Sequence, residues 1–253
     1  MRMLAAERHE VLLDRLNRDG KLVARDLASD LGISEDTIRR DLRDLAAAGL
    51  CQRVYGGALP VSPAIGNYAA RRGINSDGKR RVARTAAALI TPGSTVILDG
   101  GTTTLAVVAE LPPQLHATVV THSPTIASAL IDHAHVEVYL IGGRLFKHSA
   151  VACGAAAVEA AQLVNADLFL LGVTGVHAQT GLTTDDSDEA AMKRALASRA
   201  ADTYVLASSE KIGAASRFTV LPLAKVAGIV TDDAADSPAI REIMDLGHIV
   251  ISA

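Results

Sequence analysis

The stretch Ser34-Glu35-Asp36-Thr37-Ile38-Arg39-Arg40-Asp41-Leu42 decides the fold of the first part of this chain, because it predicts an amphipathic helix. Ser34 can cap this helix by accepting a hydrogen bond from a free backbone N–H, and the two acidic residues after it suit the positive end of the helix dipole. Ile38, Leu42 and Leu45 recur at i, i+4 and i+7, which is the spacing of a buried face. The opposite face carries Arg39, Arg40 and Arg43.

Arginines opposite an apolar stripe suit a helix that binds duplex DNA, because guanidinium groups contact phosphates and guanine edges. The alternative is an ordinary solvated helix with i,i+4 charge pairs, and this helix by itself fits both interpretations. The segments on either side of it favour the first.

Two short segments with helical spacing precede the stretch. Leu12 and Leu16 mark the first segment, Leu27 marks the second, and Gly20 separates them. The sequence Leu31-Gly32-Ile33 then turns the chain directly into the Ser34 cap. Two helices joined by a short turn that contains glycine are the sequence form of a helix-turn-helix.

A small wing is expected after the helix. Residues 50–55 look extended, and Gly56-Gly57 closes the unit, so Arg53 could reach the backbone of a duplex. The expected DNA-binding residues are Ser34, Thr37, Arg39, Arg40, Arg43, Arg53 and Tyr55.

These residues resemble the DeoR family of bacterial transcriptional repressors, whose winged helix-turn-helix carries S-x-x-T-I-R-R-D-L and then R-x-H-G-G-A. The chain matches the first motif completely and departs from the second at Tyr55, where the family usually has His. The resemblance implies that residues 1–57 form a domain for double-stranded operator DNA.

Length and composition limit the other possibilities. A chain of 253 residues suits one small and one mid-sized domain. Aromatic residues make up 3% and Trp is absent, so there is little equipment for stacking on single-stranded RNA. The two cysteines fall in different expected domains, which argues against a disulfide framework and fits a reducing cytoplasm. No apolar run approaches the ~18 residues of a membrane span, so no membrane association is expected.

The net charge of −3 argues weakly against DNA binding. Residues 1–57 hold ten Lys and Arg against ten Asp and Glu, whereas a DNA-binding domain is often basic as a whole. Any positive field must therefore be local to the arginines of the helix and wing. We expect modest non-specific affinity, raised by assembly into a homodimer or homotetramer that multiplies the contacts.

The rest of the chain predicts an α/β domain over residues 78–253, joined through a linker over 58–77 that lacks periodicity. Unalternated apolar runs separated by Ala-rich helical segments indicate a mostly parallel sheet covered on both faces. The helical segments include 79–90, 150–164 and 189–201. The expected strands are Thr95–Leu98, Ala117–Val120, Val136–Ile141, Leu168–Val173, Tyr204–Ala207, Val226–Val230 and His248–Ile251.

An anion site is predicted at the loop Asp99-Gly100-Gly101-Thr102-Thr103-Thr104, which follows one expected strand and precedes a helix. Glycines allow close backbone approach, threonine hydroxyls donate, and the helix start offers free N–H groups, which together suit a phosphate. A glycine turn with a threonine cap is the plain alternative. The loop is neither a Walker loop nor a dinucleotide fingerprint.

Further polar loops fall at equivalent strand ends, where ligands bind in such sheets. Lys211 could neutralise a phosphate, although a solvated loop lysine is the simpler interpretation, and Lys193 reads simply as an i,i+4 partner of Glu189. The expected effector-binding residues are Asp99, Gly101, Thr102, Thr103, Thr104, Thr121, His122, Ser123, Gly142, Gly143, Asp185, Glu189 and Lys211.

This part also resembles the DeoR family, now in its C-terminal sensor domain. The matching motifs are D-x-G-T-T, T-x-S, the GG pair, G-x-x-G with G-L-T-T-x-D-x-x-E-A-x-x-K, and S-x-K-x-G. The resemblance implies a fold like ribose-5-phosphate isomerase and the CoA transferases, with a sugar phosphate as effector. Departures are His122, where the family commonly has Asn, and Glu210 within the usual D-S-S-K segment.

No cofactor or metal is expected, because the histidines at 133, 135 and 148 do not group with Cys or carboxylates at ligand spacing. The preferred hypothesis is a non-enzymatic repressor of carbohydrate genes that a phosphorylated sugar releases from its operator. The second is a sugar-phosphate isomerase with a DNA-binding appendage, with Asp99, Asp185 or Glu189 as the base. The third is an activator, or a constitutive DNA-binding protein with a vestigial pocket.

Overall fold

The amino-terminal part folds as the helical spacing predicts. The computed structural model describes residues 3–253. Helices α1 (Ala5–Asp19) and α2 (Ala24–Leu31) each end at a glycine with positive φ, and α3 (Glu35–Ala47) begins after its Ser34 cap. The Ser34 Oγ accepts from the Thr37 N–H at 3.2 Å. The three helices enclose a small apolar core that includes Leu12, Ile38 and Leu42.

A three-stranded antiparallel sheet forms the wing. Its strands are β1 (Leu22–Val23), β2 (Gln52–Val54) and β3 (Gly57–Leu59), in the order β1-β3-β2. Gly57 is required here, because a Cβ at this position would lie 1.7 Å from the Leu22 carbonyl oxygen. Strand β3 continues to Leu59, two residues beyond the expected end of the domain at residue 57.

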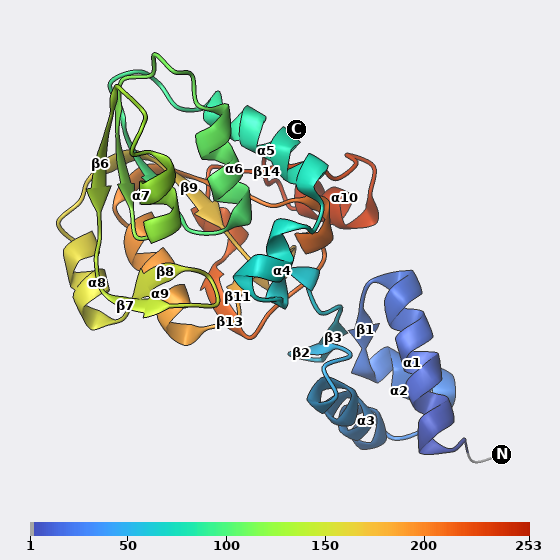
Figure 1. Cartoon of the computed structure of the whole chain (residues 1–253). Helices are drawn as coiled ribbons and strands as arrows, with labels where there is room; N and C mark the ends of the chain where they lie inside the picture. Colours follow the sequence, from blue (N-terminus) through green and yellow to red (C-terminus); the bar gives the residue numbers. More distant parts are fainter. Residues whose placement is uncertain (1–2) are drawn as a thin grey trace.

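The segment expected as a linker contains short helices, η1 (Pro63–Ile65) and α4 (Tyr68–Arg72). It lies along the larger domain, where Val61 forms a β-bridge with Ala215 and the buried Ser62 Oγ donates to the Thr174 carbonyl at 2.6 Å. Figure 1 shows α4 between the amino-terminal helices and the large sheet. The boundaries at residues 57 and 77 stay predictions.

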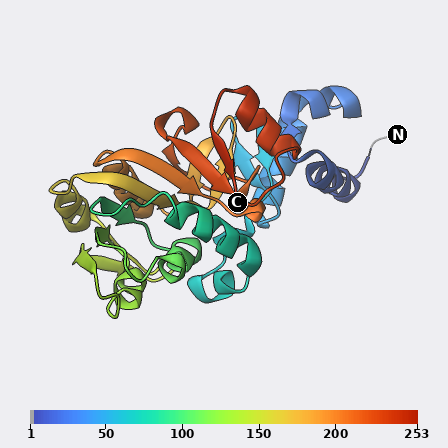
Figure 2. The same cartoon turned by 90° about the horizontal axis from the view of Figure 1, so that it is seen from above.

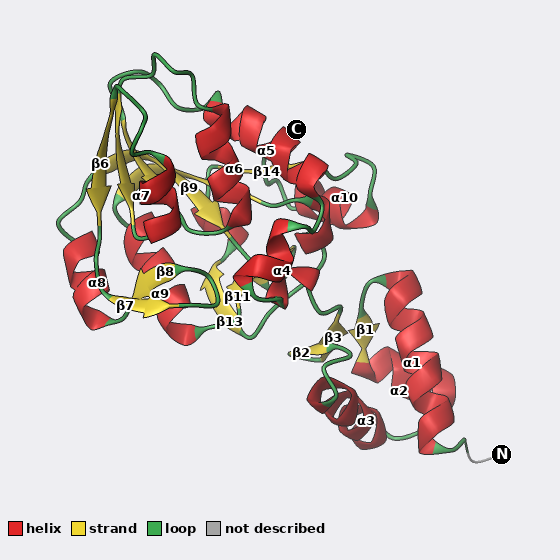
Figure 3. Ribbon diagram, viewed as in Figure 1, coloured by secondary structure: helices red, strands yellow, loops and turns green. Residues whose placement is uncertain are grey.

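A seven-stranded sheet forms the centre of the larger domain, and all of its neighbouring strands are parallel (Figure 3). Its strand order is β15-β14-β12-β9-β4-β5-β6. Each of the seven expected runs is one of these strands, so the expected fold class is confirmed. The strands are β4 (Thr95–Leu98), β5 (Ala117–Thr121), β6 (Val136–Leu140), β9 (Ala166–Gly172), β12 (Ala200–Leu206), β14 (Gly228–Thr231) and β15 (Val250–Ser252).

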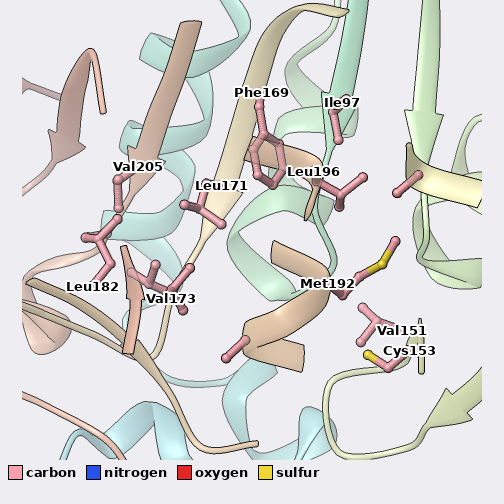
Figure 4. Close-up of a cluster of buried hydrophobic side chains, with 14 of the residues drawn as sticks. Ile97, Val151, Cys153, Phe169, Leu171, Val173, Leu182, Met192, Leu196 and Val205 are labelled. Carbon is pink, nitrogen blue, oxygen red and sulfur yellow. The ribbon is translucent and has the colours of Figure 1, made fainter. Parts of the chain in front are cut away.

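Helices cover both faces of this sheet, which explains why its strands are apolar without alternation. In β4, Ile97 packs on one face while Val96 and Leu98 pack on the other. One face is covered by α5 (Ser76–Ala87), α6 (Thr102–Glu110) and α7 (Pro124–Ala129). The other is covered by α8 (Ala155–Ala161), α9 (Ser187–Ala197) and α10 (Pro238–Asp245), and Figure 4 shows Phe169, Met192 and Leu196 within that core.

Smaller strands surround the sheet at positions where the sequence analysis predicts no strand. A hairpin of β7 (Arg144–Phe146) and β8 (Val151–Cys153) replaces the start of the helix expected over 150–164, which was therefore wrong by several residues. A second antiparallel sheet contains β10 (Gly175–His177), β11 (Gly181–Thr184) and β13 (Phe218–Leu221). The single turns η2 (Ser209–Lys211) and η3 (Leu223–Lys225) complete the described elements.

The amino-terminal helices lie to one side of the larger domain (Figure 2). Between residues 3 and 253, no helix has both the length and the apolar character needed to cross a membrane.

Candidate functional site

Helix α3 exposes its arginines, as the sequence predicts. Ile38 and Leu42 are buried, and the side chains of Arg39, Arg40 and Arg43 are exposed on the other face. Arg39 donates to the Glu35 carboxylate at 2.7 Å, which is the i,i+4 pair of the alternative interpretation. Such exposed pairs contribute little stability, so Arg39 can exchange this partner for a phosphate or a base at small cost.

The wing presents two expected residues beside this helix. Arg53 lies on β2 and is exposed, and Tyr55 is fully exposed at the turn before β3. Ser34 and Thr37 lie at the start of α3 with their hydroxyl oxygens 2.9 Å apart. All seven expected DNA-binding residues therefore belong to α3, its cap or the wing.

Asp41, to which sequence reasoning gave no role, fixes α3 against α1. It is 3% exposed and accepts two hydrogen bonds from Arg8, from Nε at 2.7 Å and from Nη2 at 2.8 Å. The bidentate contact sets the position of α3 relative to α1. The sequence did offer a signal for this structural role: a carboxylate among exposed arginines does not attract DNA.

A pocket lies at the carboxyl edge of the sheet, where β4 leads into α6. Gly101, with φ of +117°, is the N-cap of α6, and no side chain among residues 3–253 caps this helix. The first backbone N–H groups of α6 therefore have no intrahelical partners, and Thr102, Thr103 and Thr104 line the pocket beside them. Thr103 and Thr104 are buried, which holds this helix start rigidly in the wall.

Lys211 closes the pocket from the η2 turn. Its side chain is buried, and its Nζ donates to the Thr103 Oγ1 at 3.2 Å. Burial lowers the pKa of Lys211 to about 8, and the nearby cations Lys79 and Arg71 act in the same direction against the opposite effect of Glu210. The interpretation as a solvated lysine is wrong, because this cation lies in the pocket wall without a direct carboxylate contact among residues 3–253.

Beneath the pocket, Asp99 is the centre of a buried network. Its Oδ1 contacts the His122 Nε2 at 2.8 Å, and its Oδ2 accepts from Lys193 and from the Gly172 N–H. Burial by itself would raise the pKa of Asp99, but Lys193 and His122 outweigh burial and lower it to about 2. The other His122 nitrogen, Nδ1, faces the Ala152 carbonyl at 2.8 Å. The network ties β4, β5 and β9 together under the anion loop.

Lys193 is more than the surface pair that its spacing suggests. It is 2% exposed, and its Nζ lies 3.4 Å from the Glu189 carboxylate as well as beside Asp99. Burial lowers the pKa of Lys193, but the two carboxylates outweigh burial and raise it. Glu189 in turn accepts from the Thr184 hydroxyl at 2.6 Å. Both side chains reach the pocket.

The structure brings together some of the expected effector residues and separates others. Those that line the pocket are Gly101, Thr102, Thr103, Thr104, Glu189 and Lys211. Asp99, Thr121, His122 and Ser123 are buried under or beside it, whereas Gly142, Gly143 and Asp185 lie outside the lining. The polar lining that sequence reasoning missed includes Arg71 and Lys79, which come from segments distant in sequence, whereas Glu210 lies in the expected loop beside Lys211.

One grouping in the described residues has the spacing of metal ligands, namely His9, Asp41 and Asp44. Arg8 already occupies the Asp41 carboxylate in a bidentate contact, so a cation there would have to displace the guanidinium. The expected absence of a metal site stays a prediction.

Both domains match known family models. Residues 8–64 match the DeoR-like helix-turn-helix domain, and residues 74–233 match the DeoR C terminal sensor domain. The chain belongs to the DeoR family. The two matches follow one another along this chain in the order that the sequence predicts.

Curated DeoR-family relatives align over nearly the whole chain. The transcriptional regulator GlpR of Haloferax volcanii is 34% identical, with 98% of each chain covered. The putative aga operon transcriptional repressor of Escherichia coli O157:H7 is 30% identical, covering 97% of this chain and 93% of its own. The glycerol-3-phosphate regulon repressor of Escherichia coli K12 is 28% identical, covering 91% and 92%. The chain is a DNA-binding transcriptional regulator, and the isomerase hypothesis is not supported.

Solved structures with a similar fold include a ribose 5-phosphate isomerase A from Methanocaldococcus jannaschii. It has a TM-score of 0.41 and 17% identity and covers 54% of each chain. The sorbitol operon regulator SorC from Klebsiella pneumoniae has a TM-score of 0.37 and 12% identity, covering 84% of this chain and 92% of its own.

Proposed function

We propose that this regulator represses genes of carbohydrate metabolism and leaves its operator when a phosphorylated sugar or sugar derivative fills the pocket. The proposal rests on the start of α6, where free backbone N–H groups, threonine hydroxyls and the Lys211 ammonium converge. Each of these groups binds phosphate in proteins. Relatives that are named as repressors, one of them of a glycerol-3-phosphate regulon, support the proposal.

The pocket also offers acceptors for the rest of an effector. Glu189 and Glu210 line it together with the cations, and carboxylates accept hydrogen bonds from sugar hydroxyls. The phosphate is assigned to Gly101–Thr104 and Lys211, and the hydroxyls to the two glutamates. Asp99, His122 and Ser123 then act indirectly, by holding the loops beneath the pocket. Gly142, Gly143 and Asp185 lie outside the lining, so only a larger ligand would contact them.

Operator binding is assigned to α3 and the wing. Arg39, Arg40 and Arg43 contact phosphates and base edges in the major groove, and Arg53 with Tyr55 contacts the adjoining backbone. Assembly into a homodimer or homotetramer places two such units on paired half-sites, which compensates for the neutral charge of residues 1–57. The protein acts where chromosomal DNA is, in the cytoplasm.

Release requires that the effector favours an arrangement of the domains that fits the operator poorly. A coupling free energy of ~1–3 kcal/mol, the usual range, lowers operator affinity roughly 5–150-fold.

A thermal-shift screen of the full chain tests the proposal, with triose, pentose and hexose phosphates beside the matching free sugars. A phosphorylated compound is expected to raise the Tm while its free sugar does not. The same compound is then added to the complex with operator DNA, which genomic selection with the purified protein identifies, and is expected to weaken binding. A Tm shift without any change in operator affinity would instead support a constitutive DNA-binding protein.

Arg39→Ala provides the matched control on the DNA side. Loss of a bidentate base contact costs ~1–3 kcal/mol and relaxes specificity at one base pair. The variant is expected to keep the full Tm shift with the effector. Absence of sequence preference in the genomic selection with the unmodified protein would contradict the proposed function.

A further inference from the structure

The segment that joins the two domains also forms one wall of the pocket. Ala64, Arg71 and Ile74 line the same cavity as the anion loop and Lys211. The chain reaches this position only a few residues after β3 of the wing. Anything bound in the pocket therefore lies against the connection to the DNA-binding domain.

Arg71 on α4 is an unusual cation within this wall. Its Nη2 donates to the His148 carbonyl at 2.8 Å, but its Nε is buried and has no hydrogen-bond partner among residues 3–253. No carboxylate in the described chain forms an ion pair with it. Burial lowers the pKa of Arg71 against the opposite effects of Glu189, Tyr68 and Asp99, and the Tyr68 ring lies 5.9 Å from the guanidinium carbon. A partly buried guanidinium whose Nε donor is inaccessible and unpaired is destabilising unless an anion completes its contacts.

The side chains that line the cavity carry a net positive charge, like Arg71 itself. Arg71, Lys79, Lys193 and Lys211 line it, and only the carboxylates of Glu189 and Glu210 line it with them. The Lys79 Nζ donates to the backbone carbonyl of Arg71, so the lysine holds α4 in place and leaves the guanidinium itself free to change partners. A phosphate between Arg71 and Lys211 would satisfy both cations, and the planar guanidinium can bind two of its oxygens.

We propose that Arg71 binds the anionic group of the effector, and that its change of partner from the His148 carbonyl to this anion transmits occupancy to the DNA-binding domain. The inference rests on the proposed function and adds the residue that couples the two sites. His148 also contacts the segment that joins the two domains, because its Nε2 lies 2.8 Å from the Ile65 carbonyl. When Arg71 leaves the His148 carbonyl, the contacts that hold η1 and α4 against the hairpin change together.

The test compares Arg71→Met, Arg71→Lys and the control Arg72→Met in the full chain. Arg72 is the exposed neighbour of Arg71 on the same helix and lines no part of the pocket. Isothermal titration measures the affinity for inorganic phosphate and for the sugar phosphate with the largest Tm shift. Fluorescence anisotropy measures the ratio of the operator Kd values with and without that sugar phosphate.

Arg71→Met is expected to weaken binding of both probes at least tenfold and to bring the operator ratio close to 1. Arg71→Lys keeps the charge but not the two-oxygen contact, so its affinity and its ratio are expected to be intermediate. Arg72→Met is expected to behave like the unmodified protein. The Tm of Arg71→Met without probe is expected to be unchanged or higher, since a partly buried cation with an unpaired donor is gone.

Full affinity and a full operator ratio in Arg71→Met would overturn this inference and leave the proposed function intact. Lower affinity for the probes with an unchanged operator ratio at saturation would mean that Arg71 binds the anion but does not couple the two sites. This result would overturn the proposed transmission to the DNA-binding domain. Failure of every sugar phosphate to bind the unmodified protein would overturn the proposed function together with this inference.

Discussion

At the scale of single residues, burial changes the chemistry of Lys211. A surface lysine stays charged through the physiological pH range, but the pKa of Lys211 is lowered to about 8 from 10.5, because burial removes water and Lys79, Arg71 and Lys193 repel its charge. Glu210 offsets only part of this effect. An anion at Thr103 would stabilise the protonated form and raise the pKa again.

Effector affinity should therefore fall with rising pH. Above pH 7 a phosphate group carries a nearly constant charge, because its second pKa is about 6. Above pH 8 the free pocket holds Lys211 neutral, so binding must take up a proton, and the Kd is expected to rise up to about tenfold per pH unit. Titrations at pH 7, 8 and 9 measure this slope.

Lys211→Arg is the control for the pH dependence, because arginine stays charged over this range. The variant is expected to show a flat Kd between pH 7 and 9. The same slope in Lys211→Arg as in the unmodified protein would place the titrating group elsewhere.

Asp99 and Lys193 form a second case in which one side chain depends on another. Asp99→Asn leaves Lys193 as a buried cation with only Glu189 at 3.4 Å for compensation. Breaking such a pair costs about 3–5 kcal/mol, and we expect a Tm lower by roughly 10 °C. Calorimetry of the purified variant measures the loss.

The double variant Asp99→Asn with Lys193→Met tests the cause of that loss. Removal of the cation should restore part of the stability, because the uncompensated charge is then gone. A double variant no more stable than Asp99→Asn would show that lost hydrogen bonds to His122 and Gly172, and not the buried charge, dominate.

At the scale of elements, α3 depends on its attachment as much as on its arginines. The Arg8–Asp41 contact joins α1 and α3 across 33 positions of sequence. A helix that reads a groove must hold its side chains at a fixed angle, so a loosened α3 would lose base contacts even with every arginine present.

Asp41→Ala should lower the stability of the amino-terminal domain by about 1–3 kcal/mol, because it removes two charge-assisted hydrogen bonds from a buried position. Operator affinity should fall as well, although the substitution removes a negative charge. Circular dichroism melts and anisotropy titrations measure the two effects. Asp44→Ala, an exposed position on the same helix, is expected to leave stability within about 0.5 kcal/mol. Equal losses for the two variants would contradict the anchoring role.

At the scale of the whole molecule, the DNA-binding surface and the pocket are distant in the fold but share one connector, residues 60–75. Residues 60–75 leave the wing, pack by Val61 and Ser62 on the sensor domain, and then line the pocket. A ligand that binds against this segment changes the surface on which the connector rests. The connector is thus a short physical route between pocket and DNA.

Thermodynamic linkage makes the coupling reciprocal. If the effector lowers operator affinity by a given factor, the operator must lower effector affinity by the same factor. Titration of the sugar phosphate into the free protein and into its saturated operator complex measures this factor directly. Unequal factors would mean that a third process, such as a change of oligomeric state, is linked to one of the two binding steps.

Local patterns in the sequence determined much of this protein. The caps at Gly20, Gly32 and Ser34 and the apolar spacing of α3 depend on neighbours within a few residues, so the helix-turn-helix could be read directly. The seven strands of the parallel sheet could be read because both of their faces are buried and their runs are continuously apolar. The anion loop after β4 was visible for the same local reason, since its glycines and threonines are consecutive.

Tertiary structure alone decided which charged side chains share the pocket. Lys211 and Thr103 are 108 positions apart, and Lys193 and Asp99 are 94 apart, so no spacing rule could pair them. The β7–β8 hairpin and the β10–β11–β13 sheet likewise depend on pairing whose strands are short and weakly patterned. In the sequence Arg71 falls within the expected linker, and only the packing of α4 places it in the pocket wall. Burial and electrostatic compensation are properties of the assembled interior, and a sequence specifies them only through the fold.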